Sequence, residues 1–279
     1  MPLTTSHFSR LPLLTYVLLA ASVMALARRY YDDTTLALTV TSVLMFACCW
    51  ASATHLLGTR AALKFVLVAV CVGWFAEQMG ASHGWFFGDY RYTGVLGYRL
   101  GDVPVIIPLM WFVLTYVGYV ISNLIVWQSA VDGAPGLGNA FVLSSLAAMI
   151  VTAYDLGADP YMVYTLKAWI MVKTDGAWFG ETVQGFAGWM LVSFVIVMGF
   201  RLSVRRVLPL PAGPFMRGHA LLPLAIYASS MVFQMLRGSP VETRTIALFA
   251  MGIPLLCALA GFQRWRAHEA AATSSGGQA

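Results

Sequence analysis

Long apolar runs, separated by short charged segments, follow one another along almost the whole chain. A helix needs about 20 such residues to cross the roughly 30 Å hydrocarbon core of a bilayer, and about eight of the runs have this length. Of the 279 residues, 59% are hydrophobic and only 10% are charged, whereas a soluble domain carries about 25% charged residues. The sequence therefore predicts an all-α, polytopic integral membrane bundle of about eight transmembrane helices. We place these at residues 11–27, 36–57, 61–78, 103–127, 137–156, 183–200, 219–236 and 245–262.

Two apolar segments need separate interpretation. Residues 161–172 are too few for a full span and include Lys167, so we expect a half-span or interfacial helix; a full crossing would make the count nine. The first run is predicted to be a transmembrane helix and not a signal peptide, because Arg28–Arg29 is not a small-residue cleavage site. We expect a single transmembrane domain over residues 1–269 and a disordered Ser/Gly/Ala-rich tail at 270–279.

The basic residues indicate the orientation of the chain. They are densest after the sixth run and at the C-terminal flank, at Arg201, Arg205, Arg206, Arg217, Arg264 and Arg266. The excess of Lys and Arg on cytoplasmic loops then predicts a multi-pass protein of the cell membrane with both termini in the cytoplasm. Membrane lipid is the expected surrounding, and without a basic–aromatic stripe we expect no nucleic acid partner.

The acidic residues gather on the other side. Ten of the twelve belong to odd-numbered loops or adjoining helix ends: Asp32, Asp33, Glu77, Asp89, Asp102, Asp155, Asp159, Asp175, Glu181 and Glu242. Glu77 and Asp155 lie inside or at the end of apolar runs, where an ionisable group is costly and indicates a functional site. Two long loops rich in Gly and aromatic residues, 80–102 and 155–182, are on this same side, and long loops tend to be functional.

Several kinds of chemistry lack their motifs. The four Cys form no CxxC pair, the five His are scattered, and no GxGxxG or Walker motif is present, so we expect no metal and no cofactor. Carboxyl groups, aromatic rings and an apolar cavity remain. A carboxyl group kept protonated by burial can deliver a proton to an alkene. Aromatic faces can shelter the resulting cation until water captures it. This combination favours hydration of an isoprenoid double bond.

Two blocks of motifs carry a family resemblance. The first contains EQMG at 77–80, FGDYRY at 87–92, LG at 96–97, VP at 103–104 and IPLMW at 107–111. The second contains Asp155, DP at 159–160, Trp169, WFG at 178–180 and FAGW at 186–189. Together they resemble the carotenoid-biosynthesis-protein family of membrane carotenoid hydratases, which includes carotenoid 1,2-hydratases and bisanhydrobacterioruberin hydratases. The chain departs from the family pattern at residues 181–185, which lack an expected Pro and Asn.

The resemblance implies a cofactor-independent hydratase (hydro-lyase) of carotenoid biosynthesis. Such an enzyme adds water across the terminal C1–C2 double bond of an acyclic ψ-end group, as in lycopene or γ-carotene. Its partners would be the carotenoid substrate and, in a biosynthetic complex, other carotenoid-biosynthesis enzymes.

Three carboxyl groups are candidate catalytic residues. Asp155 is the first choice for the proton donor, and Asp159, one helical turn on, can share its face. Pro160 is expected to end this helix, because it disfavours helical geometry at the residue before it. Glu77 is the second candidate donor. The predicted substrate-binding residues are Tyr90, Tyr92, Trp111, Trp178 and Trp189. In the competing interpretation, the two Asp are a helix-end pair without a catalytic role, and Glu77 pairs with Arg91.

Other functions stay open from the residues alone. A membrane carotenoid cyclase also begins by protonating an end group, so cavity shape decides between ring closure and water capture. Acids inside a membrane also occur in carboxylate-relay transporters, although the chain shows no internal repeat of the kind many transporters have. A carotenoid-binding scaffold subunit is the third alternative.

Overall fold

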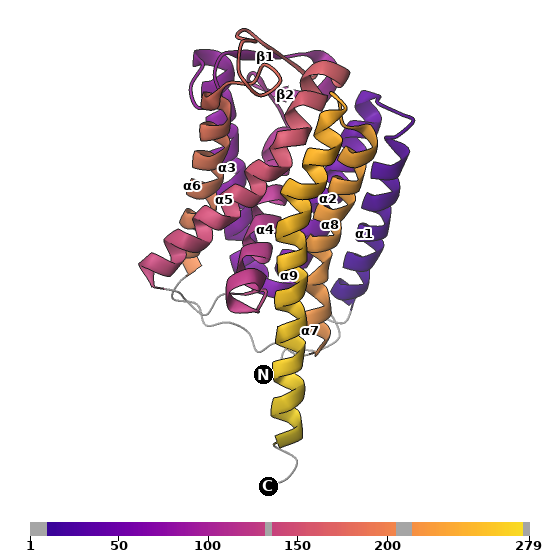
Figure 1. Cartoon of the computed structure of the whole chain (residues 1–279), viewed down its shortest axis with the longest axis vertical. Helices are drawn as coiled ribbons and strands as arrows, with labels where there is room; N and C mark the ends of the chain where they lie inside the picture. Colours follow the sequence, from indigo (N-terminus) through magenta and orange to yellow (C-terminus); the bar gives the residue numbers. More distant parts are fainter. Residues whose placement is uncertain (1–9, 132–135, 205–213, 276–279) are drawn as a thin grey trace.

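The computed structural model describes residues 10–131, 136–204 and 214–275, which contain eight helices long and apolar enough to cross a membrane. They are α1 (Arg10–Arg28), α2 (Thr35–Leu57), α3 (Thr59–His83), α4 (Ile106–Trp127), α5 (Leu137–Pro160), α6 (Val183–Val204), α8 (Leu221–Arg237) and α9 (Glu242–Ser275). A short helix, α7 (Pro214–His219), precedes α8. The predicted all-α, polytopic membrane bundle is confirmed. Figure 1 shows that α1 begins and α9 ends at the same end of it.

Helix α4 forms the centre of the bundle. Its span is 78% buried, whereas the other spans are 22–50% buried, and it contacts α2, α3, α5 and α9. Gly118 allows the close approach to α5, because a Cβ at this position would lie 2.9 Å from the carbonyl oxygen of Ala147. Large apolar side chains such as Leu36 and Phe249 face outward. Such a surface suits a bilayer, since lipid tails are as apolar as these side chains.

The two long loops fold together over one end of the bundle (Figure 1). Strand β1 (Tyr90–Tyr92) pairs antiparallel with β4 (Trp169–Met171), with Tyr92 opposite Trp169. A second small pair joins β2 (Arg99–Leu100) to β3 (Val103–Pro104), and a 3₁₀ turn, η1 (Gly94–Leu96), lies between β1 and β2. We call this layer, residues 84–105 and 167–182, the cap.

The expected half-span or interfacial helix at 161–172 is wrong. The α-helical geometry of α5 ends at Pro160, as predicted, but the membrane span does not. The helix continues past Pro160 as a π-helical segment, η2 (Tyr161–Leu166), so that one span extends to Leu166. Pro160 has no backbone N–H to donate, so it interrupts the α-helical hydrogen-bond pattern. The turns that follow it have π geometry, in which each hydrogen bond closes a longer ring. Beyond Lys167 the chain becomes β4. Hydropathy could not reveal this strand, because its partner lies in the other long loop.

The basic segment after the sixth span also differs from the expectation. Arg201 lies within α6 with 1% exposure and donates to Ser122 Oγ at 3.1 Å and to Asn123 Oδ1 at 2.9 Å. It is therefore a buried side chain of the bundle and not a loop residue. Arg205 and Arg206 lie outside the described residues. At the other end of the chain, α9 reaches Ser275, and residues 276–279 of the predicted tail also lie outside the described residues.

Candidate active site

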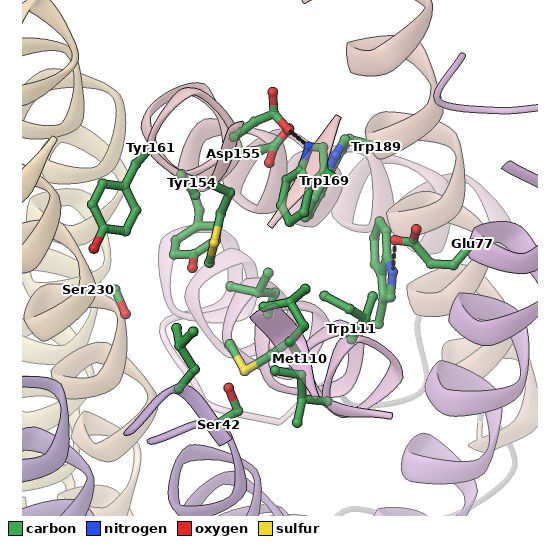
Figure 2. Close-up of a pocket in the computed structure, with 18 of the residues that line it drawn as sticks. Ser42, Glu77, Met110, Trp111, Tyr154, Asp155, Tyr161, Trp169, Trp189 and Ser230 are labelled. Atoms are coloured by element: carbon green, nitrogen blue, oxygen red, sulfur yellow. Dashed lines mark hydrogen bonds between the residues drawn. The ribbon is translucent and has the colours of Figure 1, made fainter. Parts of the chain in front are cut away.

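A cavity of about 130 Å³ lies between the helices and the cap (Figure 2). Residues of α1, α2, α3, α4, α5, α6 and α8 form its walls, and the cap contributes side chains of β1 and β4. Most of the lining is aliphatic or aromatic, but four carboxyl groups also face it: Glu77, Asp155, Asp159 and Glu181. Ligand sites of this type combine an apolar wall with a few convergent polar groups. The cavity is therefore the candidate active site.

Glu77, on α3, is held by three donors. Its Oε2 accepts from the hydroxyl of Tyr90 and, at 2.7 Å, from that of Tyr92. Its Oε1 accepts from Trp111 Nε1 at 2.9 Å, the bond drawn dashed beside Glu77 in Figure 2. Because both oxygens accept, and an indole N–H can only donate, the arrangement fits an ionised carboxylate.

The alternative pairing of Glu77 with Arg91 is wrong. Side chains alternate along a strand, so Tyr90 and Tyr92 of β1 turn inward to the carboxylate and Arg91, between them, is exposed. Burial, and then the Glu77 charge, raises the pKa of Tyr90 and of Tyr92 well above the usual value of 10. Both phenols therefore stay neutral donors at neutral pH.

Asp155 and Asp159 share one face of α5, as the one-turn spacing predicted. Both are buried, with 1% and 5% exposure, and both line the cavity. Asp159 Oδ1 accepts from Trp169 Nε1 of β4 at 3.0 Å. By contrast, Asp155 Oδ2 has no hydrogen-bond partner among the described residues. One carboxyl group is thus fixed by the cap, and its neighbour has a buried oxygen without a hydrogen-bond partner among the described residues.

Aromatic rings enclose the space beside the carboxyl groups. The rings of Trp111 and Trp189 lie 4.5 Å apart between centroids, and Phe87 stacks on Trp111 at 6.0 Å. On the cap side, Tyr92 meets Tyr90 at 5.4 Å and Trp169 at 5.9 Å, both edge to face. These faces present π electron density that attracts a cation.

Comparison with known proteins assigns the chain to a family. The sequence model of a family described as "Carotenoid biosynthesis protein" matches residues 34–258. The chain belongs to the carotenoid biosynthesis protein family. A bisanhydrobacterioruberin hydratase of Haloarcula japonica is 31% identical over 146 residues, which cover 52% of this chain and 46% of that protein. The chain thus spans about half the length of the curated relative it matches. No solved structure matches.

Four of the five aromatic residues predicted to bind substrate line the cavity of this carotenoid biosynthesis protein, namely Tyr90, Tyr92, Trp111 and Trp189. Trp178 does not. Its Nε1 donates to the carbonyl oxygen of Leu156 at 3.0 Å, so it joins the cap to α5. The reason is the β-bridge between Trp178 and Glu181, which turns the loop back on itself.

Sequence reasoning missed the contribution of Glu181. Its side chain is 4% exposed, it lines the cavity, and its Oε2 has no partner among the described residues. Burial, followed by the nearby Asp159 carboxyl, raises the pKa of Glu181 to about 10. An acid directly before an apolar helix was the only signal in the sequence. Trp169 was also missed as a site residue.

Among the described residues, no group of three or more His, Cys, Asp or Glu side chains has an arrangement that could hold a metal ion.

Proposed function

We propose that this carotenoid biosynthesis protein is a carotenoid hydratase. It would add water across the terminal C1–C2 double bond of an acyclic ψ-end group, such as that of lycopene or γ-carotene, without a cofactor. The observation that carries the proposal is the set of four buried carboxyl groups facing an apolar cavity walled by aromatic rings. The name of the similar Haloarcula japonica protein, a hydratase, supports it.

Asp155 would act as the proton donor. Asp155 lines the cavity and its Oδ2 has no partner among the described residues, so a protonated carboxyl there would not lose an internal hydrogen bond when its proton moves to the alkene. The proton forms a new C–H bond at C2, and the positive charge appears on the tertiary carbon C1. General acid catalysis of this kind typically contributes about 10²–10⁴-fold in rate.

Glu77 and the aromatic rings would stabilise the cation. The three donors hold the Glu77 carboxyl group in a fixed orientation, and as a preorganised carboxylate aimed at the developing cation it would lower the barrier. The ring of Trp111, which donates to Glu77, packs against that of Trp189. The faces of these two rings would add cation–π attraction to the developing cation.

The Asp159–Glu181 pair would complete the reaction. Two neighbouring carboxyl groups separate into one that keeps its proton and one that ionises more easily. Because the pKa of Glu181 is about 10, Asp159 would be the ionised member. Water adds to C1 and gives one proton to Asp159, from which Asp155 is reprotonated. The net change is the addition of one water molecule.

We further propose a cell-membrane location with both termini in the cytoplasm, as the basic flanks indicate. The start of α1 and the end of α9 share one end of the bundle, and the cap lies at the other (Figure 1). The cavity would then open toward the non-cytoplasmic face, where other carotenoid-biosynthesis enzymes could exchange substrate with it.

Expression in lycopene-producing cells tests the proposal. We expect 1-hydroxylycopene, with its oxygen derived from labelled water. Oxygen derived from O₂ would refute a hydratase, a cyclised product would establish the cyclase alternative, and unchanged lycopene would leave the carboxylate-relay transporter as the better explanation.

A further inference from the structure

The cavity has a second polar region that the proposed reaction does not use. Arg29, directly after α1, lines the cavity with only 7% exposure. Its Cζ lies 5.0 Å from the centroid of the Phe233 ring, and Phe233 meets Tyr161 at 5.7 Å. Figure 2 shows Tyr161 and Ser230 across the open space from Glu77. Arg29 therefore belongs to the wall that faces the Glu77 side.

The guanidinium of Arg29 has unused donors. Its Nε and Nη2 find no acceptor among the described residues. The two acids closest in sequence are already engaged. Asp32 accepts from Arg28 at 3.3 Å and from Thr34 at 2.7 Å, and Asp33 accepts from Arg237 at 2.6 Å and from Tyr161 at 3.0 Å. Buried donors of a charged group are costly when left unpaired. The arrangement thus indicates that a ligand atom with a lone pair completes the Arg29 site.

An unused acceptor lines the same cavity. Gln234 is 4% exposed, its Nε2 donates to the carbonyl oxygen of Tyr154 at 3.0 Å, and its Oε1 has no partner among the described residues. The Tyr154 ring reaches into the cavity between the two regions (Figure 2). The oxygen of a hydroxyl group has the lone pairs that the Arg29 donors lack, and a chain that carries one can lie along Gln234 in the same wall.

Charge restricts the ligand further. The four carboxyl groups disfavour an anion such as a carboxylate or diphosphate in this cavity, and Arg29 disfavours a cation at its own end. A neutral oxygen remains. We propose that Arg29, in a wall that also includes Gln234, forms a subsite for a hydroxyl group on the isoprenoid occupant, so that the cavity binds a hydroxylated chain more tightly than the same chain without the hydroxyl. This inference rests on the isoprenoid occupant of the proposed function, but not on the hydration step.

A pair of short probes tests the subsite by binding alone. Citronellol carries a terminal isoprenoid double bond and a hydroxyl group, and its hydrocarbon analogue lacks only the hydroxyl. Dissociation constants are measured by tryptophan fluorescence in lipid nanodiscs, since Trp111 and Trp189 line the cavity. The ratio of the two constants isolates the contribution of the hydroxyl. In Arg29→Met we expect the relative preference for the alcohol to fall about tenfold or more, because hydrogen bonds to charged groups are the strong ones.

The neighbouring Arg28 provides the matched control. Its side chain is 77% exposed, so Arg28→Met should leave the ratio unchanged. An unchanged ratio in Arg29→Met would overturn the subsite while leaving the hydratase proposal intact. If neither probe binds the wild type, the isoprenoid occupant is wrong, and the proposed function fails with it.

A measurement on the wild type covers the case in which Arg29→Met does not fold. The methyl ether of citronellol keeps the oxygen lone pairs but is neutral and donates no hydrogen bond, and we expect it to keep most of the advantage of the alcohol over the hydrocarbon. Binding of the ether no tighter than that of the hydrocarbon would overturn the role of Arg29.

Discussion

The indole Nε1 of Trp111 on α4 lies 2.9 Å from Oε1 of Glu77 on α3. Tyr90 and Tyr92, from the cap, occupy the other carboxylate oxygen. The position of the Glu77 carboxyl group therefore depends on two helices and a strand. A change in the packing of these elements should shift this group.

Glu77→Gln tests the need for this charge. The amide keeps the size of the side chain but removes the negative charge and directs an NH₂ group at residues that are themselves donors. We expect turnover to fall about a hundredfold or more while the protein stays folded. Trp111→Phe, which removes one donor and keeps the carboxylate, should cost less. Wild-type turnover in Glu77→Gln would exclude a role for the charge in the reaction.

Asp155→Asn tests the proton donor. Asn cannot supply the proton, so we expect turnover of lycopene to fall by about 10²-fold or more. Because Asp155 Oδ2 makes no hydrogen bond among the described residues, the thermal midpoint should change little. The matched control is Asp89→Asn, at an exposed acid outside the cavity. Full activity in Asp155→Asn would remove the assignment.

Glu181→Gln should change how stability depends on pH. The pKa of Glu181 rises from 4.5 to about 10 in the folded protein, so between these values the unfolded chain releases a proton that the folded chain keeps. The free energy of unfolding of the wild type therefore falls with rising pH, by at most about 1.4 kcal/mol per pH unit from this group. The variant lacks this slope.

Thermal denaturation of both proteins in detergent measures the effect. Below pH 4.5 the two proteins should differ little in thermal stability. As the pH rises toward 10, the Gln variant should become more stable relative to the wild type. Parallel pH profiles would show that Glu181 is not a buried neutral acid.

The sequence predicted the parts of the molecule that depend on local pattern. Eight apolar runs became eight spans, and the one-turn spacing of Asp155 and Asp159 placed both in the cavity. The parts that depend on pairing between distant segments were not predictable. Nothing local indicates that β4 pairs with β1, and this pairing places Trp169 on Asp159. The same limit explains why Trp178 was assigned to the cavity and Glu181 was not.

Gly73 provides an indirect test of the Trp111–Glu77 contact. A Cβ at Gly73 would lie 2.7 Å from Cγ and Cδ1 of Trp111, so in Gly73→Ala the indole must move relative to Glu77. We expect a loss of about 1–3 kcal/mol in stability from overpacking and a drop in turnover, although Ala otherwise favours a helix over Gly by about 1 kcal/mol.

Gly138→Ala is the control for Gly73→Ala, because nothing lies within 4 Å of a Cβ there, and it should be neutral or stabilising. The double variant Gly73→Ala/Trp111→Phe should recover part of the lost stability. Phe keeps the Cβ, Cγ and Cδ1 atoms that the methyl group would meet, but without the indole bond to Glu77 its smaller ring can shift away, and coupled neighbours are not additive. It should not recover turnover, because the donor to Glu77 is gone. Recovery of both would mean that Trp111 matters only for packing.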